Sequence, residues 1–242
     1  MVTFDRRVLA TSFGGVADVY ERTRPGYPVA AVAWLAGEHS TEVLDLAAGT
    51  GKLTRSLVAA GHDVVAVEPS EPMLAQLRAG LPGVDARLGS AEALPLPDAS
   101  VDVVTVAQAY HWFDPATALP EIARVLRPGG WLALAWNVAD ATTAWVEELW
   151  QIVNPDEPRT VERPDIGAPF GEPETHTFPH SQRLDRAGLV GLVASRSYVA
   201  VREPAERDEL LAKVAALYDR HAGPDGIVVP YVTHCFRSRP LA

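Results

Sequence analysis

Cysteine is almost absent from this chain, since Cys235 is the only one among 242 residues. A single thiol can form no internal disulfide and cannot build a cysteine-rich metal site. The histidines do not supply a site either, because His176, His180, His221 and His234 match no compact ligand spacing. We therefore expect no metal centre.

Positive charge is also scarce. The chain has 21 Lys and Arg residues against 31 Asp and Glu residues, a formal net charge of -10, and the basic residues are scattered. A protein that follows nucleic-acid phosphates normally carries clusters of basic residues. The composition therefore argues against a nucleic-acid partner.

Long apolar runs are missing as well. No segment approaches the ~18 apolar residues that a membrane span needs, and the first 15 residues lack the apolar stretch of a signal peptide. We expect a cytoplasmic protein without a membrane segment, and the sequence indicates no particular oligomeric state. The length is enough for one large domain.

The first 140 residues alternate between short apolar segments and amphipathic ones. Strands are predicted over 43–47, 63–68, 84–88, 101–107 and 131–136, and helices over 28–37, 52–60, 71–79 and 114–126. Ser70 and Asp114 suit N-caps and Pro115 suits a first helical turn. Pro120 suggests that the fourth helix starts late or kinks. This rhythm predicts a doubly wound α/β sheet of parallel strands.

The rhythm changes after Asn137. We predict helices over 141–153 and 181–194, a further helix opened by Pro204, irregular chain over 154–174, and strands over 174–178 and 226–236. The change near residue 140 indicates inserted helices rather than a domain boundary. The whole chain, 1–242, is therefore expected to be a single domain.

The most informative segment is the glycine loop over 43–54. An apolar strand leads into a turn built on Gly49 and Gly51, and a helix follows. Glycines allow a ligand to approach the backbone closely, and the helix start offers unpaired N–H groups. Such a loop suits a nucleotide or nucleoside at the carboxyl ends of the strands.

Three ligand classes compete for this loop. A phosphate-binding P-loop would need glycine at Leu46 and Ser or Thr at Leu53. A dinucleotide fingerprint would need Gly or Ala where Thr54 stands, which weakens that alternative without excluding it. Glu68 ends the next predicted strand, 17 residues after Gly51. Its carboxylate can accept from both hydroxyls of an adenosine ribose, and we favour that role.

Four motifs in order resemble the class I S-adenosylmethionine-dependent methyltransferases, particularly the methyltransferase type 11 group. They are Asp45 to Gly51, Glu68-Pro-Ser, Gly89 to Asp98, and Glu121 to Gly130. The segments 13–28 and 110–114 are similar to a subgroup that includes trans-aconitate-type and thiol methyltransferases. The resemblance implies a seven-stranded Rossmann-like sheet with an antiparallel last strand. It also implies an N-terminal cap over 10–28, a cofactor core over 40–137, and helical insertions over 138–222 that roof the acceptor site.

The resemblance also implies roles for single residues toward S-adenosylmethionine. Tyr20 and Arg24 would close over its methionine carboxylate, while Glu68 would hold the ribose and Gln108 would lie at the edge of the pocket. The remaining implied cofactor contacts are Asp45, Ala47, Gly49 and Gly51 on the loop, and Pro69, Ser70, Met73, Ser90, Ala91 and Glu92 around the adenine. Two positions depart from the family pattern. Ala47 stands where the family often has glycine, so we expect a negative φ there, and Ser90 stands where many members have Asp.

Methyl transfer from a sulfonium needs alignment and exclusion of water more than a protein nucleophile. A base is needed only for a protonated acceptor, and His111, after the fourth strand, is the candidate. The alternative is that His111 packs against the loop or hydrogen-bonds to it and has no catalytic role. Trp112 and Tyr27 would line the acceptor pocket.

The expected activity is therefore methyl transfer to a small acid, phenol or thiol. One alternative is a non-catalytic regulator that binds S-adenosylmethionine. A less favoured alternative is an NAD-dependent oxidoreductase.

Overall fold

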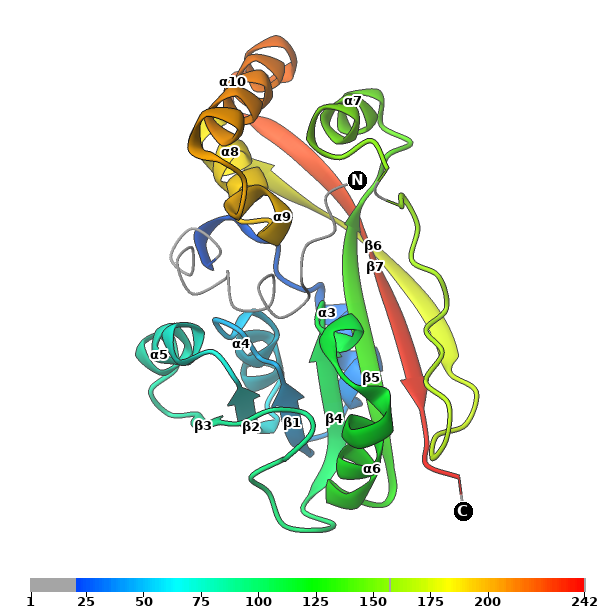
Figure 1. The fold of residues 1–242 in the computed structure, drawn as a ribbon. Coiled ribbons are helices and arrows are strands. Elements are labelled where there is room, and N and C mark those ends of the chain that lie inside the picture. The colour runs from blue at the N-terminus through cyan, green and yellow to red at the C-terminus, as the bar shows by residue number, and fades with distance from the viewer. Residues whose placement is uncertain (1–20, 157, 242) are drawn as a thin grey trace. The chain divides into compact units, whose positions relative to one another are not determined.

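The computed structural model describes residues 21–156 and 158–241. These residues form a seven-stranded sheet of order β3-β2-β1-β4-β5-β7-β6 (Figure 1). Its strands are β1 (Glu42–Leu46), β2 (Asp63–Glu68), β3 (Asp85–Leu88), β4 (Val101–Ala107), β5 (Leu126–Ala139), β6 (Glu174–Leu184) and β7 (Ile227–Ser238). Neighbours from β3 to β5 pair in parallel, and Figure 1 draws β7 in the opposite direction to β4. The predicted doubly wound, seven-stranded fold is confirmed.

The strand order turns back between β1 and β4, the point at which open α/β sheets bind their ligands. Helix α3 (Val29–Ala36) precedes β1, and the helices that connect the parallel strands are α4 (Lys52–Ala59), α5 (Glu71–Gly80) and α6 (Pro115–Val125). Figure 1 shows α6 in front of the sheet and α3 and α4 behind it. Each of the four lies within one residue or so of its predicted bounds.

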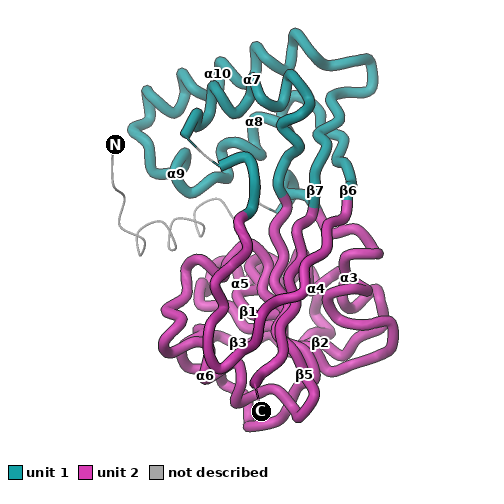
Figure 2. The backbone as a smooth tube through the Cα atoms, turned by 90° about the vertical axis from the view of Figure 1, so that its right-hand side faces the viewer, with its two compact units in different colours: residues 1–25, 138–161, 179–232 teal, residues 26–137, 162–178, 233–242 magenta. Residues whose placement is uncertain are grey.

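The chain divides into two compact units (Figure 2). Unit 2 comprises residues 26–137, 162–178 and 233–242, and unit 1 comprises 1–25, 138–161 and 179–232. Part of the unit 2 core joins α3 and α4 to the sheet through fully buried residues such as Leu35, Leu57, Val103 and Cys235. Burial of the Cys235 side chain raises the pKa of its thiol to about 12, so this cysteine is a core residue and not a nucleophile.

Unit 1 contains α7 (Ala144–Val153), α8 (Arg186–Ala194), α9 (Ser197–Ala200) and α10 (Pro204–His221). Its core packs these helices against the adjoining ends of the last strands, through Leu149, Leu189, Val214 and Val229 among others. As predicted, Pro204 opens α10 at the first turn, where its missing N–H costs no hydrogen bond.

The bounds of the predicted strands over 131–136 and 174–178 were too short, because β5 runs over Leu126–Ala139 and β6 over Glu174–Leu184. The predicted helix over 181–194 begins only at Arg186, because residues up to Leu184 continue strand β6. The Asp185 side chain accepts from the Gly188 N–H at 2.7 Å and so caps α8. Of the two alternatives predicted for Pro120, the late start was wrong, since helix α6 begins at Pro115 and contains Pro120, which is exposed.

Within the described part of the chain, no helix is both long and apolar enough to cross a membrane.

Candidate functional site

The predicted cofactor residues of unit 2 gather at one edge of the sheet. Because β1, β2, β3 and β4 are parallel, their carboxyl ends meet at the same edge. The loop 47–51 follows β1, and Glu68 ends β2. The segment 89–92 follows β3, and Gln108 follows β4.

The backbone of the glycine loop is left-handed at three positions. Ala47 has φ 56°, Gly49 has φ 59° and Gly51 has φ 89°. The expectation of a negative φ at Ala47 was therefore wrong. The chain must turn sharply as it leaves β1, and the turn is fixed by the Ala48 N–H, which donates to the Val67 carbonyl at 3.1 Å. A left-handed alanine costs roughly 1–2 kcal/mol, and such strained residues cluster at functional sites.

The two glycines of the loop have different neighbours. A Cβ at Gly51 would lie 3.0 Å from Leu77 Cγ and 3.2 Å from Leu81 Cδ1, so glycine there permits close packing on α5 and the chain after it. A Cβ at Gly49 would meet no atom of the described residues within 4 Å. Gly51 is therefore required by the fold, whereas Gly49 leaves room beside the backbone for a ligand.

The Glu68 carboxylate is fixed by two backbone groups. Its Oε2 accepts from the Gly49 N–H at 2.8 Å and its Oε1 accepts from the Ser70 N–H at 2.9 Å. Glu68 is 6% exposed, and this burial raises the pKa of its carboxyl despite the two hydrogen bonds. Each carboxylate oxygen has a second lone pair, so the group can still accept from two hydroxyls. Glu68 thus ties the loop to the end of β2 and has the chemistry expected of a ribose ligand.

Asp45 lies beneath the loop and not on its surface. It is 1% exposed, and its carboxylate accepts from the Thr54 hydroxyl at 2.6 Å and from the Thr105 hydroxyl at 3.2 Å. Burial raises the pKa of Asp45 to about 6, against the effect of these hydrogen bonds. The sequence did not indicate this role for Thr54 or Thr105, because Thr105 is 60 residues away and a buried threonine carries no distinctive pattern.

The residues predicted around the adenine lie on α5 and on the segment after β3. Ala91 and Met73 are both 3% exposed, whereas Pro69 is exposed and Ser70 occupies the N-cap of α5 without a side-chain cap bond. The Glu92 Oε1 accepts from the Asp114 N–H at 3.2 Å. Ser90 is half-buried and forms a short β-bridge with Ala93.

Arg124 and Glu121 of α6 hold the segment after β3 in place. Arg124 forms ion pairs with Glu121 at 2.7 Å and with Asp98 at 2.8 Å, and it donates to the Leu96 carbonyl at 2.9 Å. Glu121 Oε2 accepts from the Leu94 N–H at 2.9 Å. Arg124 lowers the pKa of Glu121 to about 2. This cluster therefore fixes residues 94–98, which follow directly after the segment from Ser90 to Glu92. The sequence analysis did not predict this role for Arg124 and Glu121.

Beyond β4 the backbone is again left-handed, at Gln108 with φ 60°. The Gln108 side chain donates to the Asn137 carbonyl at 3.3 Å, and the Asn137 amide donates to the Gly26 carbonyl at 3.0 Å. The Thr233 hydroxyl donates to Asn137 Oδ1 at 2.6 Å. Asn137 therefore joins β5 to β4, to β7 and to the chain before α3, a role that sequence reasoning missed.

Of the predicted acceptor residues, His111 and Trp112 follow Gln108 closely in the chain, and Tyr27 precedes α3. His111 and Trp112 belong to a short 3-10 helix, η2 (Tyr110–Trp112), in which His111 is exposed and its ring lies 4.5 Å from that of Trp112. Tyr27 is half-buried and packs against the core next to α3.

Arg24 and Tyr20, the two residues predicted to close over the cofactor, do not belong to the described part of unit 2. Arg24 belongs to unit 1, where its Nε donates to Ser195 Oγ at 2.9 Å. Tyr20 lies outside the described residues.

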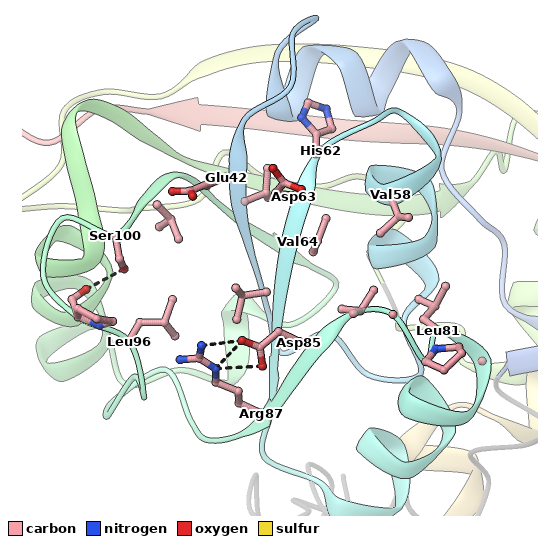
Figure 3. Close-up of a pocket in the computed structure, with 18 residues that line it drawn as sticks. Glu42, Val58, His62, Asp63, Val64, Leu81, Asp85, Arg87, Leu96 and Ser100 are labelled. Atoms are coloured by element: carbon pink, nitrogen blue, oxygen red, sulfur yellow. Dashed lines mark hydrogen bonds and ion pairs between the residues drawn. The ribbon is translucent and has the colours of Figure 1, made fainter.

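A cavity of about 630 Å³ lies at the other edge of the sheet (Figure 3). Glu42, Asp63 and Asp85, which line it, are the first residues of β1, β2 and β3. The Asp85 carboxylate forms an ion pair with the Arg87 guanidinium at 2.6 Å. The cavity thus opens at the amino ends of the strands and is lined by none of the predicted cofactor residues.

Comparison with known proteins identifies the family. A methyltransferase-domain family matches residues 44–134. An uncharacterised methyltransferase of Mycobacterium tuberculosis is 47% identical over 240 residues, covering 98% of this chain and 99% of the relative. The chain belongs to the class I S-adenosylmethionine-dependent methyltransferases. Open α/β sheets bind their ligands at the carboxyl ends of the strands, which is the edge where the predicted cofactor residues gather.

Two further matches agree with this assignment. A malonyl-[acyl-carrier protein] O-methyltransferase of Methylococcus capsulatus is 36% identical over 163 residues, covering 63% of this chain and 59% of that protein. The structure of a type II methyltransferase from Anaeromyxobacter dehalogenans matches with TM-score 0.68 and 27% identity, covering 90% of this chain and 97% of that one.

The residues present fit the donor that this family uses. Gly49 offers room beside the backbone, and the Glu68 carboxylate lies against the same loop, held by the Gly49 N–H. A nucleoside with two ribose hydroxyls matches this combination of open backbone and buried acceptor.

Proposed function

We propose that this methyltransferase transfers the methyl group of S-adenosylmethionine to a small-molecule acceptor, an acid, a phenol or a thiol. The observation that carries the acceptor class is the net charge of -10 with scattered basic residues. A nucleic-acid acceptor would require a phosphate-binding surface that this composition does not supply. The name of the Methylococcus relative, an O-methyltransferase, supports oxygen among the acceptor atoms.

The residue roles follow from the site. Glu68 would hold the donor ribose, and the loop with Gly49 would lie against the nucleoside. Gln108, bonded to the Asn137 carbonyl, would form the side of the pocket after β4. The donor supplies an activated methyl group, so the chain contributes alignment of the two reactants and exclusion of water.

His111 is the proposed base for an acceptor that arrives protonated. It follows β4, the strand that ends at the donor edge of the sheet, and its ring is exposed. A positioned base contributes about 10²- to 10⁴-fold to such a reaction. His111→Asn should therefore lower the rate of methyl transfer by that factor and leave the dissociation constant of S-adenosylhomocysteine unchanged. An unaltered rate would remove the catalytic role.

The experiment is transfer of a radiolabelled methyl group to panels of small acids, phenols and thiols. Total tRNA and a protein mixture serve as competing acceptor classes, and the Glu68→Gln variant serves as the control for the donor site. We expect labelled product from at least one small-molecule panel and none from the macromolecules. Label that appears only in RNA or protein would contradict the proposal.

A further inference from the structure

The cavity at the amino ends of the strands lies beside a free edge of β2. Strand β3 pairs with β2 only from Val65 onward, where Val65 lies opposite Asp85. The first two residues of β2, 63 and 64, therefore have no residue of β3 opposite them. Residues 80–84, which lead into β3, and residues from 96–101 form further walls of this cavity of about 630 Å³. Such a volume is typical of a small-molecule site.

Much of the cavity lining is apolar. Val58 at the end of α4, Val64 of β2 and Leu81 after α5 contribute to it, with Leu96 and Val101 from the chain before β4. The Val58 side chain remains 40% exposed, and Val64 and Leu81 are half-buried. A ligand with a hydrocarbon part would remove this apolar surface from water.

His62 places a hydrogen-bond acceptor in the lining, although the residue is only 6% exposed. The Thr41 hydroxyl donates to the Ala36 carbonyl at 3.2 Å and lies 2.9 Å from His62 Nδ1. Because a hydroxyl has one proton, the second bond is donated by the Nδ1–H group. Burial lowers the pKa of His62, so the ring is neutral at neutral pH and Nε2 carries a lone pair. Among the described residues, Nε2 has no hydrogen-bond partner.

Negative charge lies at the same end of the cavity. Asp63 of β2 lies opposite Glu42 of β1 in the sheet register, and Figure 3 shows their carboxylates on the same side of the view as the His62 ring. The Glu42 carboxylate pairs with Arg127, which also pairs with Asp102. Asp63 is exposed, and no cation of the described chain pairs with its carboxylate.

The positive charge in the lining does not offset Asp63. Arg87 is the only lysine or arginine among the described residues that line the cavity. Its guanidinium pairs with Asp85 at 2.6 Å and donates to the Pro95 carbonyl at 2.6 Å. An anionic ligand would therefore meet the uncompensated charge of Asp63, whereas a cation would be attracted by it.

We propose that this cavity binds a small apolar primary amine, whose ammonium group donates to the Asp63 carboxylate and to His62 Nε2. Successive side chains of a strand point to opposite faces, so His62 and Asp63 flank the free edge of β2 from two sides. An ammonium group at this edge lies between them. It has three donors and no acceptor, which matches two acceptors that lack a donor. The hydrocarbon part of the amine covers Val58, Val64 and Leu81.

This site is separate from the proposed donor site. Asp63 and Glu68 are the first and last residues of β2. At about 3.3 Å per residue, they lie about 17 Å apart. The amine is therefore a second ligand and not the methyl acceptor, and the proposal does not rest on the proposed function.

Calorimetry on the whole protein at neutral pH tests the site with four related compounds. Phenethylamine should bind, whereas phenethyl alcohol and phenylpropionate, which lack the positive charge, should not. Phenethyltrimethylammonium keeps the charge but has no N–H group, so it should bind at least about tenfold more weakly than phenethylamine. Saturating phenethylamine should leave the dissociation constant of S-adenosylhomocysteine unchanged.

Variants separate the two acceptors. Asp63→Asn should weaken phenethylamine binding about tenfold, because it removes the charge that the ammonium group pairs with. The matched control is Glu38→Gln, which removes an exposed carboxylate outside the lining and should leave binding unchanged. His62→Phe should reduce the preference for phenethylamine over the trimethylammonium compound.

Four results would overturn the proposal. They are no binding of phenethylamine, equal binding of the alcohol, equal affinities in Asp63→Asn and Glu38→Gln, and competition between phenethylamine and S-adenosylhomocysteine. The last result would place the amine at the carboxyl ends of the strands. Because Asp63 is exposed, its variant should unfold at a temperature close to that of the wild type, and a loss of affinity is then a loss of the contact.

Discussion

The Gly49 N–H donates a hydrogen bond of 2.8 Å to Glu68 Oε2, and this bond joins the loop after β1 to the end of β2 in the proposed donor site. Glu68 also accepts from the Ser70 N–H. In Glu68→Gln one of these two N–H groups would face an amide NH₂ instead of an oxygen. Because hydrogen bonds to charged groups contribute about 1.5–3 kcal/mol, we expect at least a tenfold loss of S-adenosylhomocysteine affinity by calorimetry.

The control for Glu68→Gln is Glu71→Gln, three residues further along the chain. The Glu71 side chain is 62% exposed and forms an ion pair with Arg78. This change should leave S-adenosylhomocysteine binding as in the wild type. A Glu68→Gln protein that binds as tightly as the control would remove Glu68 from the site.

Gly49 and Gly61 form a matched pair for testing the loop. Both are left-handed, with φ of 59° and 90°, and a Cβ at either would meet no atom of the described residues within 4 Å. Alanine at either position should cost about 1–2 kcal/mol of stability in urea denaturation. Only Gly49→Ala should also weaken S-adenosylhomocysteine binding, because its methyl group occupies the space proposed for the nucleoside. Equal affinities in the two variants would contradict the placement of the donor.

Asp45 makes the stability of the fold depend on pH. The pKa of its carboxyl is about 6 in the folded state, against 3.8 for an ordinary aspartate, so between these pH values the folded protein holds a proton that the unfolded chain releases. This contribution is fully present below pH 3.8 and is lost as the pH rises through 6. Asp45→Asn does not titrate. Its free energy of unfolding, relative to the wild type, should therefore increase between pH 4 and pH 7, by up to about 3 kcal/mol.

Urea denaturation at several pH values measures this difference, with Asp85→Asn as the control of opposite sign. The hydrogen bond from Arg87 lowers the pKa of Asp85, so Asp85 contributes stability at high pH and loses it as the pH falls. A difference for Asp45→Asn that is flat or falls with rising pH would show that burial does not control its proton.

Arg124 should matter more for stability than an exposed arginine. Its side chain and that of Glu121 are 30% and 25% exposed, and Arg124 also donates to the carbonyls of Leu96 and Leu94. Arg124→Ala should lower the free energy of unfolding by about 2–3 kcal/mol. Arg186→Ala, which breaks a pair that is more than half exposed, should change it by less than about 1 kcal/mol. Similar losses of unfolding free energy in the two variants would contradict the role of Arg124 in holding the segment after β3.

Sequence patterns predicted the parts of this fold that depend on local chemistry. Short apolar segments predicted the parallel strands, and the structure places the predicted glycine turn and Glu68 at the same edge of the sheet. The predicted negative φ at Ala47 was wrong, because the left-handed turn there is fixed by the hydrogen bond from the Ala48 N–H to the Val67 carbonyl of the neighbouring strand and not by the Ala47 side chain.

Hydrogen-bond partners that are distant in the sequence could not be predicted either, because the folded chain and not the local sequence brings them together. Thr54 and Thr105 hydrogen-bond Asp45 only after strands distant in the sequence have paired. The end of β6 was predicted as helix because residues 181–184 lack a strong alternation in hydrophobicity, although they alternate in burial.

The most direct test of the account is thermal unfolding of the protein with S-adenosylhomocysteine and NAD added separately. At 100 times its dissociation constant, a ligand stabilises the native state by about 2.7 kcal/mol. We predict a clear rise in unfolding temperature with S-adenosylhomocysteine, abolished in Glu68→Gln, and none with NAD. A rise with NAD alone, or none with S-adenosylhomocysteine, would contradict the assignment of the carboxyl edge as a methyl-donor site.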